Sequence, residues 1–135
     1  MLAANKYPQA YVDECRARIA LQMSTYRALA DAAPARSLEP FEHQFFNNMV
    51  LVLDHLLVHR TRALEKKDGN PLNEVRMICN SLLRNQGELA ADTTIKFDPS
   101  KSVIGLHVGD GIHMNAADFQ RLSDAFFDEI EAKFT

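Results

Sequence analysis

Apolar residues recur at intervals of three and four over most of the chain, which is the spacing of one face of a helix. The first such stretch covers residues 9–32 and stops before Pro34, because a proline disfavours helical geometry in the residue before it. Its apolar positions are Val12, Cys15, Ile19, Met23, Tyr26 and Ala30. The pattern predicts a first helix over residues 9–32.

A second stretch predicts a long helix over residues 38–66, with Ser37, Glu39 and Pro40 at its start. The stripe expected to be buried is Phe41, Phe45, Met49, Val52, Leu53, Leu56, Arg60 and Leu64. Between Met49 and Val58, eight of ten residues are apolar, which leaves little room for a polar face. We therefore expect this helix to be central or to lie at a subunit interface, and Leu53→Ala to cost about 2 to 5 kcal/mol of stability while Glu65→Ala costs little.

Two further helices are predicted over residues 71–86 and 115–134. The first follows Asp68-Gly69-Asn70-Pro71, where glycine suits a left-handed turn, asparagine an N-cap and proline the first helical position. The second begins at Asn115, with Asp118 three residues later as in a capping box.

Between these helices the apolar period changes from 3.6 to 2. The alternation predicts short strands near residues 93–97, 103–108 and 112–114, separated by turns. Strands this short need a surface to pack on, so we expect them to lie against the helices. The predicted fold is mainly α: a four-helix bundle-like single domain over residues 1–135 with a small antiparallel β-meander between the third and fourth helices.

Composition narrows the class of protein. The two cysteines, Cys15 and Cys79, fall on apolar stripes, which suits buried thiols in a reducing compartment. The longest apolar run, Met49–Leu53, is far too short to span a bilayer, and the first residues lack the pattern of a secretory signal, so we expect a cytoplasmic protein without a membrane partner. The net charge of -3 does not suit a dedicated nucleic-acid binder.

His55 and His59 lie four residues apart on the second predicted helix, so that both imidazoles can share one transition metal ion. Asp54 and Glu42 are in the same helix, and His107 and His113 could add further ligands, although no HExxH motif is present. The alternative is that the histidines are structural and hydrogen-bonded. No cofactor is predicted apart from this metal hypothesis.

Three further polar residues interrupt the same apolar helix. Asp54 needs a cation or hydrogen bonds if it is buried, and Arg76 or Arg84 of the third helix, or an arginine of a partner subunit, could supply the cation. A catalytic carboxylate is the alternative. Asn47 and Asn48 follow two phenylalanines and either line a ligand pocket or bond the backbone of a neighbouring loop.

The order helix, helix and hairpin is typical of a winged helix, and Arg76 and Arg84 on the third helix are candidate nucleic-acid contacts. The second helix is too long for that motif, and the region after residue 87 is acidic, with a net charge of -5 over residues 88–135. Nucleic acid is therefore not the partner we expect.

Five segments resemble a group of actinobacterial proteins for which no activity is established. They are Phe45–Asp54, Val58–Arg60, Lys67–Val75, Val108–Ile112 and Ala117–Phe119. The resemblance implies one compact helical domain and no catalytic residues.

Three hypotheses about function follow from the sequence. The first is a helical binding or assembly module that forms a homodimer, because the second helix is apolar nearly all round. The alternatives are a metal-binding protein or metalloenzyme that uses His55 and His59, and a DNA-binding regulator. No pattern marks a catalytic residue, so we lean away from an enzyme.

Overall fold

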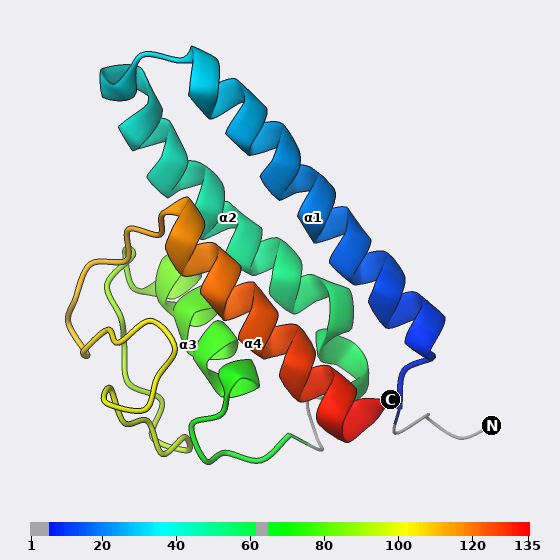
Figure 1. Cartoon of the computed structure of the whole chain (residues 1–135). Coiled ribbons are helices and arrows are strands. Elements are labelled where there is room, and N and C mark those ends of the chain that lie inside the picture. The colour runs from blue at the N-terminus through cyan, green and yellow to red at the C-terminus, as the bar shows by residue number, and fades with distance from the viewer. Residues whose placement is uncertain (1–5, 62–64) are drawn as a thin grey trace.

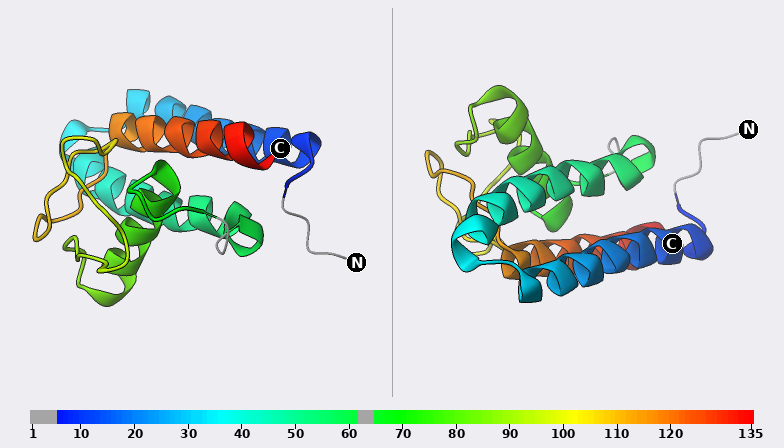
Figure 2. Two further views of the ribbon diagram at one scale, coloured as in Figure 1. Left: turned by 90° about the horizontal axis from the view of Figure 1, so that it is seen from below. Right: turned by 90° about the horizontal axis from the view of Figure 1, so that it is seen from above.

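Four helices form the described part of the molecule, a computed structural model that describes residues 6–61 and 65–135, with the side chains of residues 58–61 outside this description. The helices are α1 (Gln9–Ala32), α2 (Ala35–Thr61), α3 (Pro71–Arg84) and α4 (Ala116–Phe134). Figures 1 and 2 show α1, α2 and α4 lying alongside one another, with α1 antiparallel to the other two. The shorter α3 packs at an angle against α2 and α4. These two helices therefore pack against both α1 and α3.

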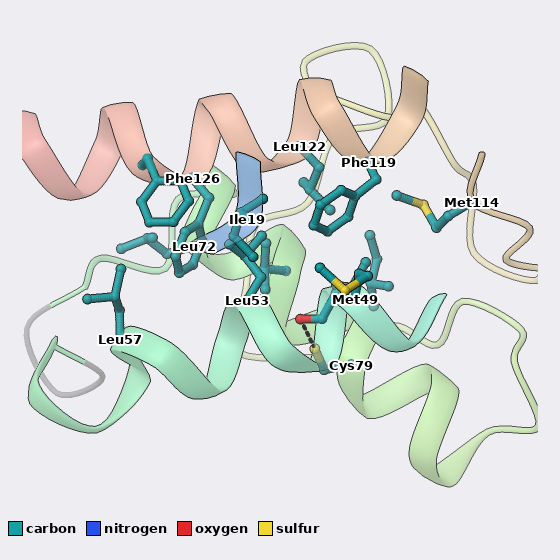
Figure 3. Close-up of a cluster of buried hydrophobic side chains, with 14 of the residues drawn as sticks. Ile19, Met49, Leu53, Leu57, Leu72, Cys79, Met114, Phe119, Leu122 and Phe126 are labelled. Carbon is teal, nitrogen blue, oxygen red and sulfur yellow. Dashed lines mark hydrogen bonds between the residues drawn. The ribbon is translucent and has the colours of Figure 1, made fainter. Parts of the chain in front are cut away.

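All four helices contribute to one core (Figure 3). Ile19 of α1, Leu53 of α2, Leu72 of α3 and Phe126 of α4 are all buried there. Both cysteines are free and buried, as expected, and the Cys79 thiol donates to the carbonyl of Val50 at 3.4 Å. None of the helices in residues 6–61 and 65–135 combines the length and apolar character that crossing a membrane requires.

The α1–α2 connection is shorter than predicted, because α2 begins at Ala35 rather than at residue 38. The carbonyl of Pro34 accepts bonds from the N–H groups of Ser37 and Leu38, both at 3.0 Å, and so starts the helix early. Pro40 consequently lies inside α2. It removes one backbone donor near the start of the helix, where the loss is tolerated more easily than in the middle.

The buried stripe of α2 is displaced from the predicted one. The fully covered apolar side chains are Phe46, Met49, Val50, Leu53 and Leu57. Phe41 and Val52 were expected in the core but are 44% and 40% exposed. The predicted extension to residue 66 is also wrong where it can be examined, because Glu65 and Lys66 are not helical, while residues 62–64 lie outside the described part.

The predicted caps of α3 and α4 are confirmed. The Asn70 side chain accepts from the N–H groups of Leu72 and Asn73, and Gly69 takes a left-handed φ of 87°. A side chain at Gly69 would collide with the backbone of Lys96, so the turn needs glycine for space as well as for conformation. Asn115 and Asp118 form the reciprocal bonds of a capping box.

The predicted β-meander is wrong, because the described residues between α3 and α4 form turns and extended loop with no strand. A single antiparallel bridge joins Glu88 to Gly111 and closes the base of this loop, which we call the covering loop (residues 85–115). At the base, Leu89 N–H donates to Asp110 O at 2.8 Å, and Gly109 N–H donates to Leu89 O at 2.8 Å.

Local side-chain bonds explain the loss of the strands. Asp92 accepts from the N–H of Thr94 at 2.9 Å, and Asp98 accepts from the N–H of Ser100 at 3.0 Å. The Ser102 hydroxyl accepts from the N–H of Gly105 at 2.6 Å. Backbone donors captured in this way are not available to a neighbouring strand, so turns replace the ladder.

Candidate functional site

One edge of α2 presents polar side chains to the covering loop. The Asn47 amide donates to the carbonyl of Ile112 at 2.9 Å, and its oxygen accepts from the N–H of Met114 at 3.0 Å. The Asn47 side chain thus makes the hydrogen bonds to the backbone of Ile112 and Met114 that a neighbouring strand would make in a sheet. Of the two alternatives for the paired asparagines, Asn47 bonds a loop backbone, whereas Asn48 is exposed on the next position of the helix.

Glu42, one turn and a residue earlier, contacts the start of α4. Its carboxylate accepts from the N–H of Ala116 at 2.8 Å, in the first turn of the helix, where a negative charge is favoured by the helix dipole. Burial, together with the nearby Glu42 carboxylate, raises the pKa of Tyr26 to about 12. Tyr26 therefore stays protonated through the physiological range.

α3 holds the middle of the covering loop through Glu74. The two carboxylate oxygens accept from the N–H groups of Val103 and Ile104 at 2.8 Å and 3.0 Å. Burial raises the pKa of Glu74, while the two backbone donors act in the opposite direction. The loop is thus fastened by carboxylate and amide groups of two helices.

Replacement of Asn47 by alanine is expected to lower the free energy of unfolding by about 1 to 3 kcal/mol, because two bonds to the loop are lost and half-buried backbone groups lose their partners. Amide hydrogen exchange should show the N–H of Met114 among those that lose most protection. Asn48→Ala, at the neighbouring exposed position, is the matched control and should leave both quantities nearly unchanged. Equal exchange in the two variants would contradict the bonding role of Asn47.

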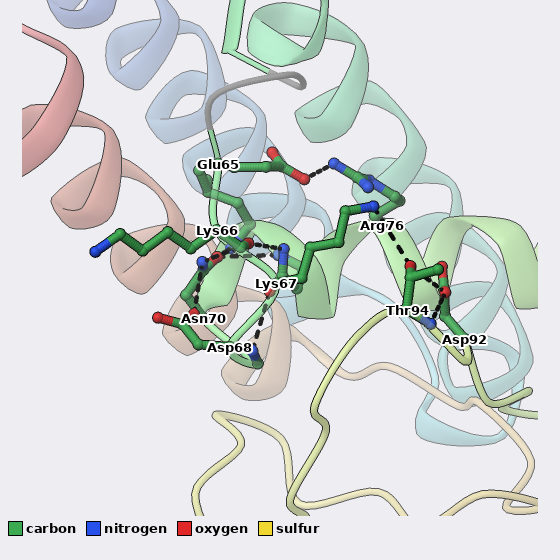
Figure 4. A network of polar contacts seen from close by, with 11 residues as sticks. Glu65, Lys66, Lys67, Asp68, Asn70, Arg76, Asp92 and Thr94 are labelled. Atoms are coloured by element: carbon green, nitrogen blue, oxygen red, sulfur yellow. Dashed lines mark hydrogen bonds and ion pairs between the residues drawn. The ribbon is translucent and has the colours of Figure 1, made fainter.

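Arg76 is buried rather than displayed on the outer face of α3. It forms an ion pair with Glu65, and the side chains of Arg76 and Glu65 are only 9% and 3% exposed (Figure 4). This corrects two expectations. Arg76 is not accessible to a nucleic acid, and Glu65 is not a surface residue whose removal costs little.

A polar network continues beside this ion pair (Figure 4). The ammonium group of Lys67 donates to the hydroxyl of Thr94 at 3.4 Å, which in turn donates to Asp92 at 2.7 Å. The hydroxyl and N–H of Thr94 hold the pKa of Asp92 below its ordinary value. These contacts tie the segment after α2 to the covering loop.

Arg84 is exposed and borders a cavity of about 370 Å³ between α3 and the covering loop. The cavity is lined by Met77, Asn80, Arg84, Asn85, Ala90, Ala91, Asp92 and Thr93. Asp92 adds a carboxylate to the lining of the same cavity, which is unfavourable for a phosphate backbone. Arg76 is buried, and the described residues contain no strand that could form a wing. Both observations contradict the winged-helix hypothesis.

Only one member of the predicted metal pair, His55, has a side chain among the described residues. His55 is exposed and Asp54 is half-buried, whereas the side chain of His59 lies outside the described residues. Arg76, one of the cations expected for Asp54, forms an ion pair with Glu65. In the part of the chain that the structure describes, no three His, Cys, Asp or Glu side chains are grouped to hold a metal ion.

Sequence patterns did not reveal the outer face of the α1–α2 hairpin. Seven large hydrophobic side chains are exposed among the described residues, and five of them lie on these two helices. They are Tyr11 (39%), Leu21 (64%), Leu29 (55%), Phe41 (44%) and Val52 (40%), and we call them the outer apolar face. Tyr11, Leu21 and Leu29 are large hydrophobic residues outside the buried stripe of α1. Their positions off this stripe are the sequence feature that could have indicated the outer apolar face.

These features define a mainly helical domain with a loop fastened to its helices and an apolar outer hairpin. Comparison of the chain with protein-family models, curated proteins and solved structures gives no match.

Proposed function

We propose that this protein is a helical assembly module that forms a homodimer through the outer apolar face. The observation that carries the proposal is the concentration of exposed apolar side chains on one helical hairpin. Single exposed hydrophobic residues are ordinary, but several on one surface are typical of an interaction site.

Contacts within the hairpin hold two of these side chains in place. The Tyr11 hydroxyl donates to the carbonyl of Leu56 at 2.7 Å, and the ring of Tyr26 stacks on Phe45 with the centroids 5.9 Å apart. Phe41 in turn stacks on Phe45 at 5.5 Å. Tyr11 and Phe41, toward opposite ends of the hairpin, are thus each held by a contact within it.

Small residues surround the most exposed leucine. Ala17, Ser24 and Ala28 share the outward side of α1 with Leu21, at spacings of three and four residues, and all are exposed. A surface with one large side chain among small ones allows another helix to approach closely.

A second copy of the chain is the partner that best fits such a surface. A twofold interface brings the same patch of each subunit together, so the patch must be complementary to itself. An apolar face meets this condition, whereas a face of one charge does not. The apolar character of α2 that pointed to an interface in the sequence thus supports the proposal in part, through Phe41 and Val52.

Leu21→Glu is expected to convert the dimer into a monomer at micromolar concentrations, because a buried unpaired carboxylate at the interface costs far more than it does in water. Analytical ultracentrifugation measures the change, and the dimer dissociation constant should rise by at least about tenfold. Leu83→Glu on α3 is the matched control, because Leu83 has the same 64% exposure as Leu21. A wild-type protein that is monomeric throughout the range, or equal dissociation in both variants, would refute the proposal.

A further inference from the structure

The covering loop brings a histidine of the loop against a histidine of α2. The rings of His43 and His113 meet edge to face, with centroids 5.6 Å apart and an interplanar angle of 63°. The two residues are 70 positions apart in the sequence, so only the fold places them together. Neither belongs to the His55 and His59 pair that the helical spacing singles out.

The hydrogen bond of His43 determines which ring nitrogen is available. Nδ1 of His43 lies 3.1 Å from the carbonyl oxygen of Met114. Because a carbonyl oxygen only accepts, Nδ1 must carry the proton, and in the neutral ring Nε2 keeps its lone pair. A backbone carbonyl that binds one nitrogen while the other stays free is the usual environment of a histidine that ligates a metal.

His113 is exposed and its ring lies over Gly111. A β-carbon built on Gly111 would stand 3.0 Å from Nε2 of His113, closer than nearly all real contacts. Glycine at this position therefore leaves room for the imidazole, and the exposed ring can turn about its side-chain bonds. The main-chain bonds of Asn47 to Ile112 and Met114 hold the backbone on both sides of His113 against α2.

We propose that His43 and His113 together bind one divalent transition metal ion such as Zn²⁺, with water molecules completing its coordination. A zinc ion bonds imidazole nitrogen at about 2.0 to 2.1 Å in tetrahedral geometry, which places the centroids of two ligating rings about 5 Å apart. The observed separation of 5.6 Å is close to this value, so a small rotation of His113 is enough. Imidazole pairs suit zinc, copper and nickel rather than magnesium or calcium.

Such an ion joins the covering loop to α2. His43 belongs to α2 and His113 to the covering loop, and these two elements are otherwise linked by side-chain bonds to the loop backbone. Because the two histidines meet only in the folded protein, the bound ion cross-links the native state and not the unfolded chain. A ligand that binds the folded state raises its stability in proportion to the logarithm of the free ligand concentration. The site is independent of the proposed dimer, because Asn47 and His43 share the loop side of α2 whereas Val52 lies on its outer side.

The inference is tested by titrating Zn²⁺ into protein purified without a histidine tag. Isothermal calorimetry measures the binding, and ¹⁵N spectra of the histidine rings show which rings take part. The ring signals of His43 and His113 should shift together and saturate at one ion per chain. His113→Ala, at an exposed position, should weaken the binding by at least about tenfold and abolish the increase in melting temperature that Zn²⁺ gives the wild type.

His107→Ala is the matched control, because His107 lies in the same loop, is exposed, and stands 3.7 Å from Asp110 rather than beside another ring. It should bind Zn²⁺ as the wild type does. The inference is overturned by undetectable binding, by unchanged affinity in His113→Ala, or by shifts confined to the rings of His55 and His59. Since ultracentrifugation of the metal-free protein reports on the dimer separately, failure of one proposal leaves the other standing.

Discussion

Leu53→Ala is expected to lower the free energy of unfolding by about 2 to 5 kcal/mol, measured by urea denaturation. Leu53 is 0% exposed. Figure 3 shows its side chain among Ile19 of α1 and Phe126 of α4, with Leu72 of α3 nearby. Because all four helices meet around this position, they cannot close the cavity that alanine leaves without moving relative to one another.

Leu83→Ala is the control for this prediction. Leu83 has the same side chain as Leu53, but it is 64% exposed on α3 and lies outside the outer apolar face. Its truncation should cost less than about 1 kcal/mol. Similar losses in the two variants would show that the buried face of α2 is not the one described.

Arg76→Ala is expected to cost about 3 to 5 kcal/mol, because it leaves the Glu65 carboxylate buried without its cation. The loss should appear in the same denaturation experiment. A surface ion pair would contribute about 1 kcal/mol or less, so the size of the effect distinguishes a buried pair from an exposed one.

Simultaneous replacement of both partners gives a sharper test. The double variant Glu65→Leu with Arg76→Met removes the two charges together and should recover most of the stability that either single variant loses. Purely additive losses would mean that the two side chains do not depend on one another. Arg84→Ala, on the same helix but exposed, should change the stability little.

The helices and their caps could be predicted because their signals are local. Asn70 and Pro71 define the start of α3 within four residues, and Asn115 with Asp118 does the same for α4. The buried stripe of α1 could likewise be predicted, since Val12 and Ile19 are two helical turns apart with mostly polar residues between them. In α2 the run from Met49 to Val58 is apolar on nearly every side, so periodicity could not tell the covered face from the exposed one.

The covering loop could not be predicted because its partners are remote. Ile112 and Met114 alternate with His113 as in a strand, but the group that bonds them is the side chain of Asn47, more than 60 positions earlier. Val103 and Ile104 are likewise bonded by Glu74 of α3. Alternation records which side chains face the helices and does not record what the backbone bonds.

The burial of the polar residues of α3 could not be predicted from the sequence, for a related reason. Asn73, Glu74 and Arg76 form a polar face that resembles a solvent-exposed one, yet all three are buried. The covering loop and the segment around Glu65 lie over this face and supply its partners. Polarity on a helix therefore marked a second contact surface, and with it the bonds that fix the loop.

The arrangement of the helices also bears on how the molecule can come apart. Within the described residues, the backbone of α1 lies next to those of α2 and α4 but not next to that of α3, whereas α2, α3 and α4 are all neighbours of one another. Displacement of α1 alone would therefore leave the neighbouring backbones of the other three helices in place. Such an opening uncovers the groove that receives Val12, Ile19 and Met23, and an α1 from another copy can fill it. The hairpin that carries the outer apolar face is in this sense also the element through which two chains could exchange helices.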